Sequence, residues 1–159
     1  MFKKCSTAQD MTLKKDKMGY VITYGLGPHF RQKLFDDIHP DHPFSVSYDE
    51  SLNKISQMDV MLTFWSKSKE ETCTMYVGSA FLGHTTAAEL LKGLKSVVNL
   101  DEMKRMINLA MDGPNVNWKM YRDLLAELKV LFLVELISIG SCGLHTTHNS
   151  FKQCFTILG

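Results

Sequence analysis

The sequence predicts an α/β fold, with a mixed sheet of about five strands and flanking helices. Alternating apolar and polar residues in the first half predict strands, and two apolar-faced helical stretches in the second half enclose a short buried strand. The expected order is β-β-β-α-β-α-β-α, in which an antiparallel meander leads into parallel crossovers. The chain has 159 residues, of which 45% are hydrophobic and 22% charged, a globular composition that suits one domain.

Three strands are expected in the first half of the chain. Residues 44–49 alternate between large apolar and polar side chains, which is the two-residue period of a strand. A second strand is expected from Val60 to Trp65 and a third from Cys73 to Val77. The polar stretch 66–71 between them indicates an antiparallel hairpin.

The second half alternates helices with strands. Thr86 and Glu89 form a capping-box pattern at the start of one helix, and Ile107 to Met111 form the next strand. Gly113-Pro114 ends that strand and opens a second helix, because proline fits a first helical turn. A fifth strand is expected at residues 136–139 and a last helix at residues 144–155.

The N-terminal region divides into an arm and the beginning of the domain. Residues 1–19 carry a cluster of lysines and are expected to form a flexible, solvated arm, with the domain covering residues 20–159. His29 to Ile38 is expected to form a short helix, and residues 39–43 form a turn that contains two prolines.

Composition favours an intracellular protein, nuclear or cytoplasmic, that is neither secreted nor inserted in a membrane. The formal net charge is +1, so no strong overall field attracts nucleic acid or lipid. No signal-peptide core is visible, and the longest apolar run, Val130 to Val134, is far shorter than the ~20 residues of a spanning helix. The four cysteines form no Cys-x-x-Cys pair.

Two aspartates at strand ends are the candidate site. Asp49 ends the first strand and Asp112 follows the fourth, and in α/β sheets ligands collect at strand ends. Such a pair can hold Mg²⁺ or Mn²⁺, which prefer oxygen ligands. Glu50 is expected on the opposite face from Asp49, and residues 136–159 contain no acid. Alternatively, Asp49 forms a turn and Asp112 caps a helix.

A second candidate metal site lies near the C-terminus. Cys142, His145 and His148 recur every three residues, so a helix would place them roughly along one face. Structural zinc sites use four ligands and catalytic sites three plus water. The alternative gives the cysteine a core position and the histidines ordinary hydrogen bonds.

Four segments together resemble a group of animal genome proteins derived from hAT-type transposases. These segments are residues 48–53, 57–59, 111–118 and 140–149, and they contain an Asp-Glu-Ser strand end, an Asp-Gly turn and a Cys-x-x-His. The resemblance implies a ribonuclease H-like domain in which three carboxylates bind two divalent metals for DNA strand cleavage and transfer. In that comparison Asp49 matches the first acid and Asp112 the second.

The chain also departs from this family. It has no BED-type zinc finger before the domain, and it lacks the helical insertion with the third acid. We therefore expect a C-terminally truncated, transposase-derived domain that is catalytically inactive and binds DNA or protein weakly. Two alternatives remain: a metal-dependent strand transferase or nuclease that takes its third acid from another chain, and a structural protein-interaction module.

Overall fold

The computed structural model describes residues 15–51 and 56–137. These residues fall into two units that divide between Asp37 and Ile38, and each unit is described by itself. The sequence pattern predicted a boundary after residue 19 instead. The difference arises because one helical segment runs from Lys15 to Asp37 and does not stop at Tyr20.

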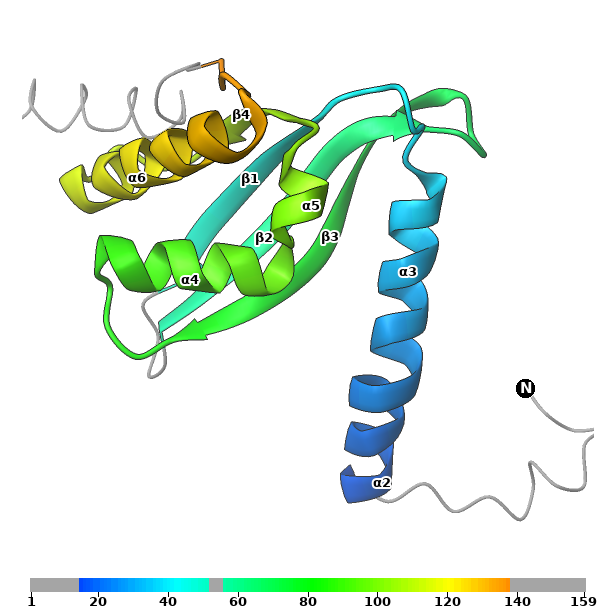
Figure 1. Cartoon of the computed structure of the whole chain (residues 1–159). Coiled ribbons are helices and arrows are strands. Elements are labelled where there is room, and N and C mark those ends of the chain that lie inside the picture. The colour runs from blue at the N-terminus through cyan, green and yellow to red at the C-terminus, as the bar shows by residue number, and fades with distance from the viewer. Residues whose placement is uncertain (1–14, 52–55, 138–159) are drawn as a thin grey trace, which may run out of the picture. The chain divides into compact units, whose positions relative to one another are not determined.

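The described part of the first unit, residues 15–37, consists of three successive helical elements, α2 (Lys15–Tyr20), η1 (Val21–Leu26) and α3 (Gly27–Asp37), which are shown in Figure 1. The element η1 is a π-helical turn, in which the Gly27 N–H donates to the Ile22 carbonyl five residues earlier. A Cβ atom at Gly27 would lie 2.9 Å from that carbonyl oxygen, so the turn requires glycine. The helix expected from His29 to Ile38 corresponds to α3, which begins at Gly27 and continues directly from η1.

The second unit contains a four-stranded mixed sheet, which confirms the predicted α/β class. Its strands are β1 (Phe44–Ser51), β2 (Ser56–Ser66), β3 (Glu71–Leu82) and β4 (Met106–Ala110), in the spatial order β3-β2-β1-β4. Strand β2 is antiparallel to both β1 and β3, whereas β4 is parallel to β1. The meander and the parallel crossover therefore follow the expected order.

Only the start of the expected fifth strand lies within the described residues. Ile137 forms a parallel bridge with Asn108, and its N–H donates to the Ile107 carbonyl at 2.7 Å. The chain thus returns beside β4, on the side away from β1. Residues 138–159, which include the expected last helix, lie outside the described part, as do residues 1–14.

Two long helices pack side by side on one face of the sheet, α4 (Ala87–Val97) and α6 (Asn115–Phe132), as Figure 1 shows. We call this the covered face, and its side chains form the core together with the apolar sides of both helices. Among its fully buried members are Val46, Met58, Val60, Leu62, Leu90, Leu94, Met120 and Leu124. We call the other face the open face, because most of its side chains are exposed or half-exposed.

Local hydrogen bonds explain where the helices begin. At α4, Thr86 Oγ1 accepts from the Glu89 N–H at 3.3 Å, but the Glu89 carboxylate accepts from the His84 N–H instead of completing the expected capping box. A complete capping box forms between Asn99 and Glu102 at α5 (Leu100–Met103). Among the described helices, none combines the length and apolar character needed to cross a bilayer.

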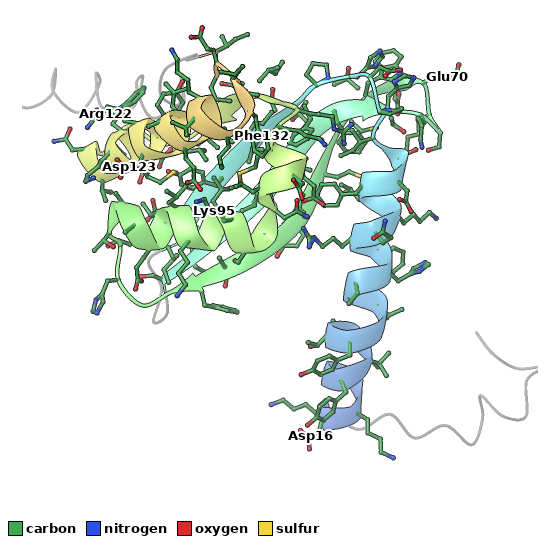
Figure 2. The ribbon with its side chains drawn as sticks, in the orientation of Figure 1. Asp16, Glu70, Lys95, Arg122, Asp123 and Phe132 are labelled. Atoms are coloured by element: carbon green, nitrogen blue, oxygen red, sulfur yellow. The ribbon has the colours of Figure 1, made fainter. Side chains whose placement is uncertain are left out.

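An ion pair joins the two long helices at their surface. Lys95 of α4, labelled in Figure 2, bonds to the Glu127 carboxylate of α6, and both side chains are half-exposed. Such a partly exposed pair stabilises by less than about 1 kcal/mol. The packing of α4 on the sheet therefore depends on its apolar side.

Replacing Leu94 by alanine tests that dependence. Leu94 is fully buried in α4, so we expect Leu94→Ala to lower the free energy of unfolding by about 2–5 kcal/mol. The matched control is Leu91→Ala on the same helix, where the side chain is only half-buried and the loss should be clearly smaller. Urea denaturation measures both variants. Equal losses would contradict the packing described here.

Candidate functional site

The ends of β1 and β4 bring the two predicted aspartates to one edge of the sheet. Ser47 of β1 lies beside Ala110 of β4 in the parallel register. Asp49 and Asp112 each follow these partners by two residues, so continuing the register places them at neighbouring positions. Their charges also act together, because both raise the pKa of the adjacent Glu50.

Asp49 lies on the open face and is exposed. Its partner across the antiparallel pair is Asp59 of β2, so two carboxylates stand opposite each other. The Asp59 carboxylate accepts hydrogen bonds from Ser79 Oγ and, at 2.7 Å, from Gln57 Nε2. These two hydrogen bonds hold the pKa of Asp59 below its usual value. The open face is therefore acidic at this end.

Glu50 lies on the covered face, beside the start of α6. Burial is the largest cause of its raised pKa, and the charges of Asp112 and Asp49 add to it. A hydrogen bond from the Asn117 side chain acts in the opposite direction and favours the ionised form. The half-buried Glu50 carboxyl thus holds its proton to a higher pH than an ordinary glutamate.

Asn117 contributes a buried oxygen to the same end of the sheet. It is the third residue of α6, and 1% of its surface is exposed. Among the described residues its Oδ1 has no hydrogen-bond partner, an arrangement that costs free energy in a folded protein. Carboxylate and amide oxygens are ligands that hard divalent cations accept. The site therefore offers Glu50, Asp112 and the Asn117 amide.

A third acid does not join this set in the described part of the chain. Across residues 15–51 and 56–137, no group of three His, Cys, Asp or Glu side chains is arranged to hold a metal ion. Asp49 and Glu50 are neighbours in sequence but belong to opposite faces of the sheet. The two-residue period of β1 thus separates two of the carboxylates.

Tyr48 lies beneath this site on the covered face. Its hydroxyl donates to Met111 Sδ at 3.7 Å, which joins the ends of β1 and β4. Burial strongly raises its pKa, and the charges of Glu50 and Asp112 raise it further. The phenol therefore remains neutral and acts as a packing group, not as a base.

The second candidate metal site lies outside the described residues. Cys142, His145 and His148 all belong to the range 138–159, so the zinc interpretation remains a prediction. Within the described part, Cys73 of β3 is a buried free thiol.

Sequence reasoning missed Asn117 and set Glu50 aside because it faces away from Asp49. The two-residue period of β1 places Glu50 on the opposite face from Asp49 but does not predict a hydrogen-bond partner for Glu50. That partner depends on where the first turn of α6 meets the sheet, which no local pattern specifies. The sequence did contain one signal for the burial of Glu50. Tyr48, two positions earlier, belongs to the apolar face of the same strand, so Glu50 shares that face.

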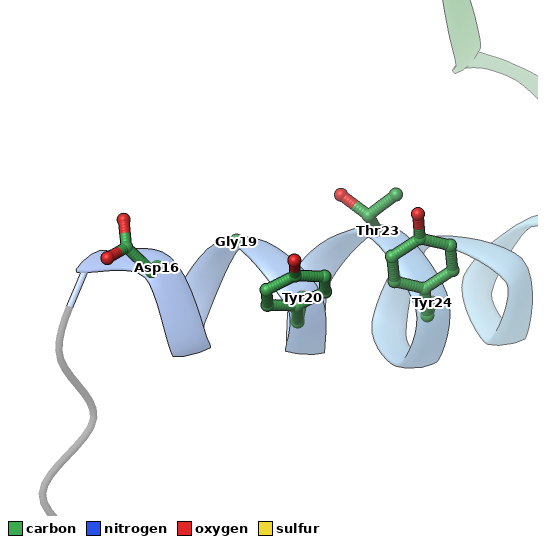
Figure 3. Close-up of a pocket in the computed structure, with 5 residues that line it drawn as sticks. All are labelled: Asp16, Gly19, Tyr20, Thr23 and Tyr24. Atoms are coloured by element: carbon green, nitrogen blue, oxygen red, sulfur yellow. The ribbon is translucent and has the colours of Figure 1, made fainter.

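A shallow hollow in the first unit gathers no comparable chemistry. Figure 3 shows Tyr20, Thr23 and Tyr24 along one side of the helix, with Asp16 and Gly19 nearby. The two tyrosine rings stack with their centroids 5.8 Å apart. One carboxylate and two phenols on an exposed helix do not enclose a ligand.

Comparisons with known proteins give no family assignment. No protein-family model matches the chain, and no curated protein matches it.

The pH dependence of stability tests the environment of Glu50. Because its folded pKa is raised, stability falls as the pH rises from the ordinary value of 4.5 through the folded pKa. Glu50→Gln removes this loss, so the variant should gain stability relative to the wild type between pH 4 and pH 7. Urea denaturation at both pH values measures the difference. A constant difference would contradict the burial of Glu50.

Asp59→Asn is the matched control with the opposite sign. Its hydrogen-bonded carboxylate has a lowered pKa, so the stability that it contributes is lost as the pH falls through that pKa. The disadvantage of Asp59→Asn relative to the wild type should therefore shrink at low pH, where the Glu50→Gln variant also loses its advantage.

Proposed function

We propose that this chain is a ribonuclease H-like domain derived from an hAT-type transposase, that it has no strand-cleavage activity and that it acts by binding another macromolecule. The antiparallel meander, with β4 parallel to β1, supports this proposal, because the sequence resemblance implies such a sheet. Asp49 and Asp112, the residues that match the first two acids, lie at neighbouring strand ends. The proposed location is intracellular, either nuclear or cytoplasmic.

The single observation that carries the proposal is this pair of strand-end acids, which no third acid joins to form a metal-binding group in the described part of the chain. Two-metal cleavage needs carboxylates that bridge and surround both ions. In the described residues no three-acid group is arranged to hold a metal ion, and Glu50 lies on the opposite face of β1 from Asp49. This arrangement supports the proposal that Asp49 and Asp112 are the remains of an ancestral metal site and that the present domain does not cleave DNA.

The open face supports binding to protein more than binding to DNA. Met61, Trp65 and Tyr76 expose apolar surface there, and such surface favours protein contacts. Asp49 and Asp59 on the same face repel a phosphate backbone. Weak DNA binding through the early lysines is the second form of the proposal, and it would be strongly salt-dependent.

An active enzyme is the competing proposal, in which another chain supplies the third acid to a Mg²⁺ or Mn²⁺ site. One observation favours it: the buried Asn117 Oδ1, near Glu50 and Asp112, has no hydrogen-bond partner within residues 15–51 and 56–137. A bound cation would satisfy that oxygen. A plasmid-cleavage assay distinguishes the two proposals.

We expect the full chain to leave supercoiled plasmid uncut in Mg²⁺ or Mn²⁺, because two acids and an amide do not support two-metal chemistry. The assay compares the wild type with Asp112→Asn and with the control Asp101→Asn, an exposed acid on α5. All three should behave alike. Metal-dependent cleavage that Asp112→Asn abolishes and Asp101→Asn preserves would establish the enzyme instead.

A further inference from the structure

Strand β3 forms the outer edge of the sheet. It has 12 residues and pairs with β2 alone among the described strands. Outside the β2–β3 ladder, no backbone hydrogen bond between described residues reaches positions 72–82. Because an edge strand has unpaired N–H and C=O groups along one side, β3 offers a template for another strand.

The strand carries few of the features that prevent pairing. Natural edge strands are usually short or carry lysine, proline or inward-pointing charges. In β3 the sole charged residue is Glu71, at its first position, and the strand contains no proline. One bulge is present, since Val60 pairs with Gly78 and Met61 with Tyr76, which leaves Val77 as the extra residue. The bulge leaves residues 78–82 as a separate regular stretch.

A groove runs beside this stretch. It has a volume of about 410 Å³ and is lined by residues 79–83 and by Glu89, Lys92, Gly93 and Ser96 of α4. Gly93 lets the helix lie close to the strand, because a Cβ atom there would be 3.1 Å from the side chains of Ala80 and Leu82. Phe81 projects from the strand with 72% of its surface exposed. An added strand would cover this ring.

The wall of the groove is self-complementary in charge. Glu89 and Lys92 lie one helical turn apart on α4, where Lys92 is exposed and Glu89 is half-exposed. The hydrogen bond from the His84 N–H is the largest cause of the lowered pKa of Glu89, and the charge of Lys92 lowers it further. In an antiparallel partner related by two-fold symmetry, a register that places Glu89 of each copy opposite Lys92 of the other would make this attraction occur twice. A second copy of the chain therefore fits this edge in both backbone and charge.

We propose that two copies of this chain associate through antiparallel pairing of their β3 strands, with α4 of each copy flanking the joint. The two four-stranded sheets become one continuous sheet, and the Phe81 rings are covered near the symmetry axis. This inference goes beyond the proposed function and depends neither on the origin of the domain nor on its metal chemistry.

Sedimentation velocity of the full chain tests the dimer, over about 1–100 µM, where a small interface is expected to dissociate. The wild type should show a monomer–dimer equilibrium. Phe81→Lys should be monomeric throughout, because it places a charge at the joint. The control Met61→Lys adds the same charge to the open face one strand further in, and it should dimerise like the wild type.

Charge reversal provides a second test that does not depend on Phe81. Glu89→Lys and Lys92→Glu should each weaken self-association at least about tenfold, because each places like charges opposite each other twice. An equimolar mixture of the two variants should dimerise again, since every contact in the mixed dimer pairs opposite charges. Recovery in the mixture would also show that both variants fold.

A wild type that stays monomeric, or a dimer that Phe81→Lys leaves intact, would overturn the inference. Loss of the dimer in Met61→Lys but not in Phe81→Lys would assign association to the open face instead. Failure of the mixture to recover would also count against it. A monomer that does not cleave plasmid refutes this inference alone, whereas a dimer that cleaves plasmid refutes the proposed function alone.

Discussion

The parallel pairing of β1 with β4 is the constraint on which the second unit depends. Parallel neighbours cannot be joined by a tight turn, so the chain must cross over between them. Between β1 and β4 the chain forms β2, β3, α4 and α5, and α4 covers β2 and β3 as the chain crosses from β3 back to β4. The same pairing makes both strands end at one edge, where the chain leaves β4 and enters α6. The core and the candidate site thus follow from one strand contact.

The two-residue period of β1 then places the carboxylates at that edge on opposite faces of the sheet. Asp49 and Glu50 are consecutive, yet one lies on the open face opposite Asp59 and the other is half-buried near Asn117. Burial and neighbouring negative charge push Glu50 toward its neutral form, whereas Asp49 remains in water. A metal centre needs oxygens that converge on one point, and a strand end that alternates between faces cannot supply two of them.

The elements of the second unit were predictable because their signals are local. Alternation in residues 44–49, the Thr86 cap and the Gly113-Pro114 break each act within a few residues. Three features were not predictable in this way. The π-turn at Gly27 extends the first helix against the apparent Gly-Pro break, the Asn99 cap opens a helix of one turn, and the Asn117–Glu50 contact joins segments far apart in sequence. The sequence therefore predicted the two aspartates at the strand ends, but it did not predict the contact between Asn117 and Glu50 beside them.

The two edge strands of the sheet, β4 and β3, differ in how much of their outer backbone is paired within the described chain. At β4, the chain itself begins to pair, through the Ile137 N–H and the Ile107 carbonyl. At β3 the features that limit pairing are Glu71 at its first position and the Val77 bulge, and the stretch beyond the bulge lies along a groove with both signs of charge. Burying Phe81 and pairing the free backbone groups of β3 would both lower the free energy. Among the described residues no third acid joins the strand-end pair in a metal-binding group, whereas the β3 edge has backbone groups with which a second copy could pair.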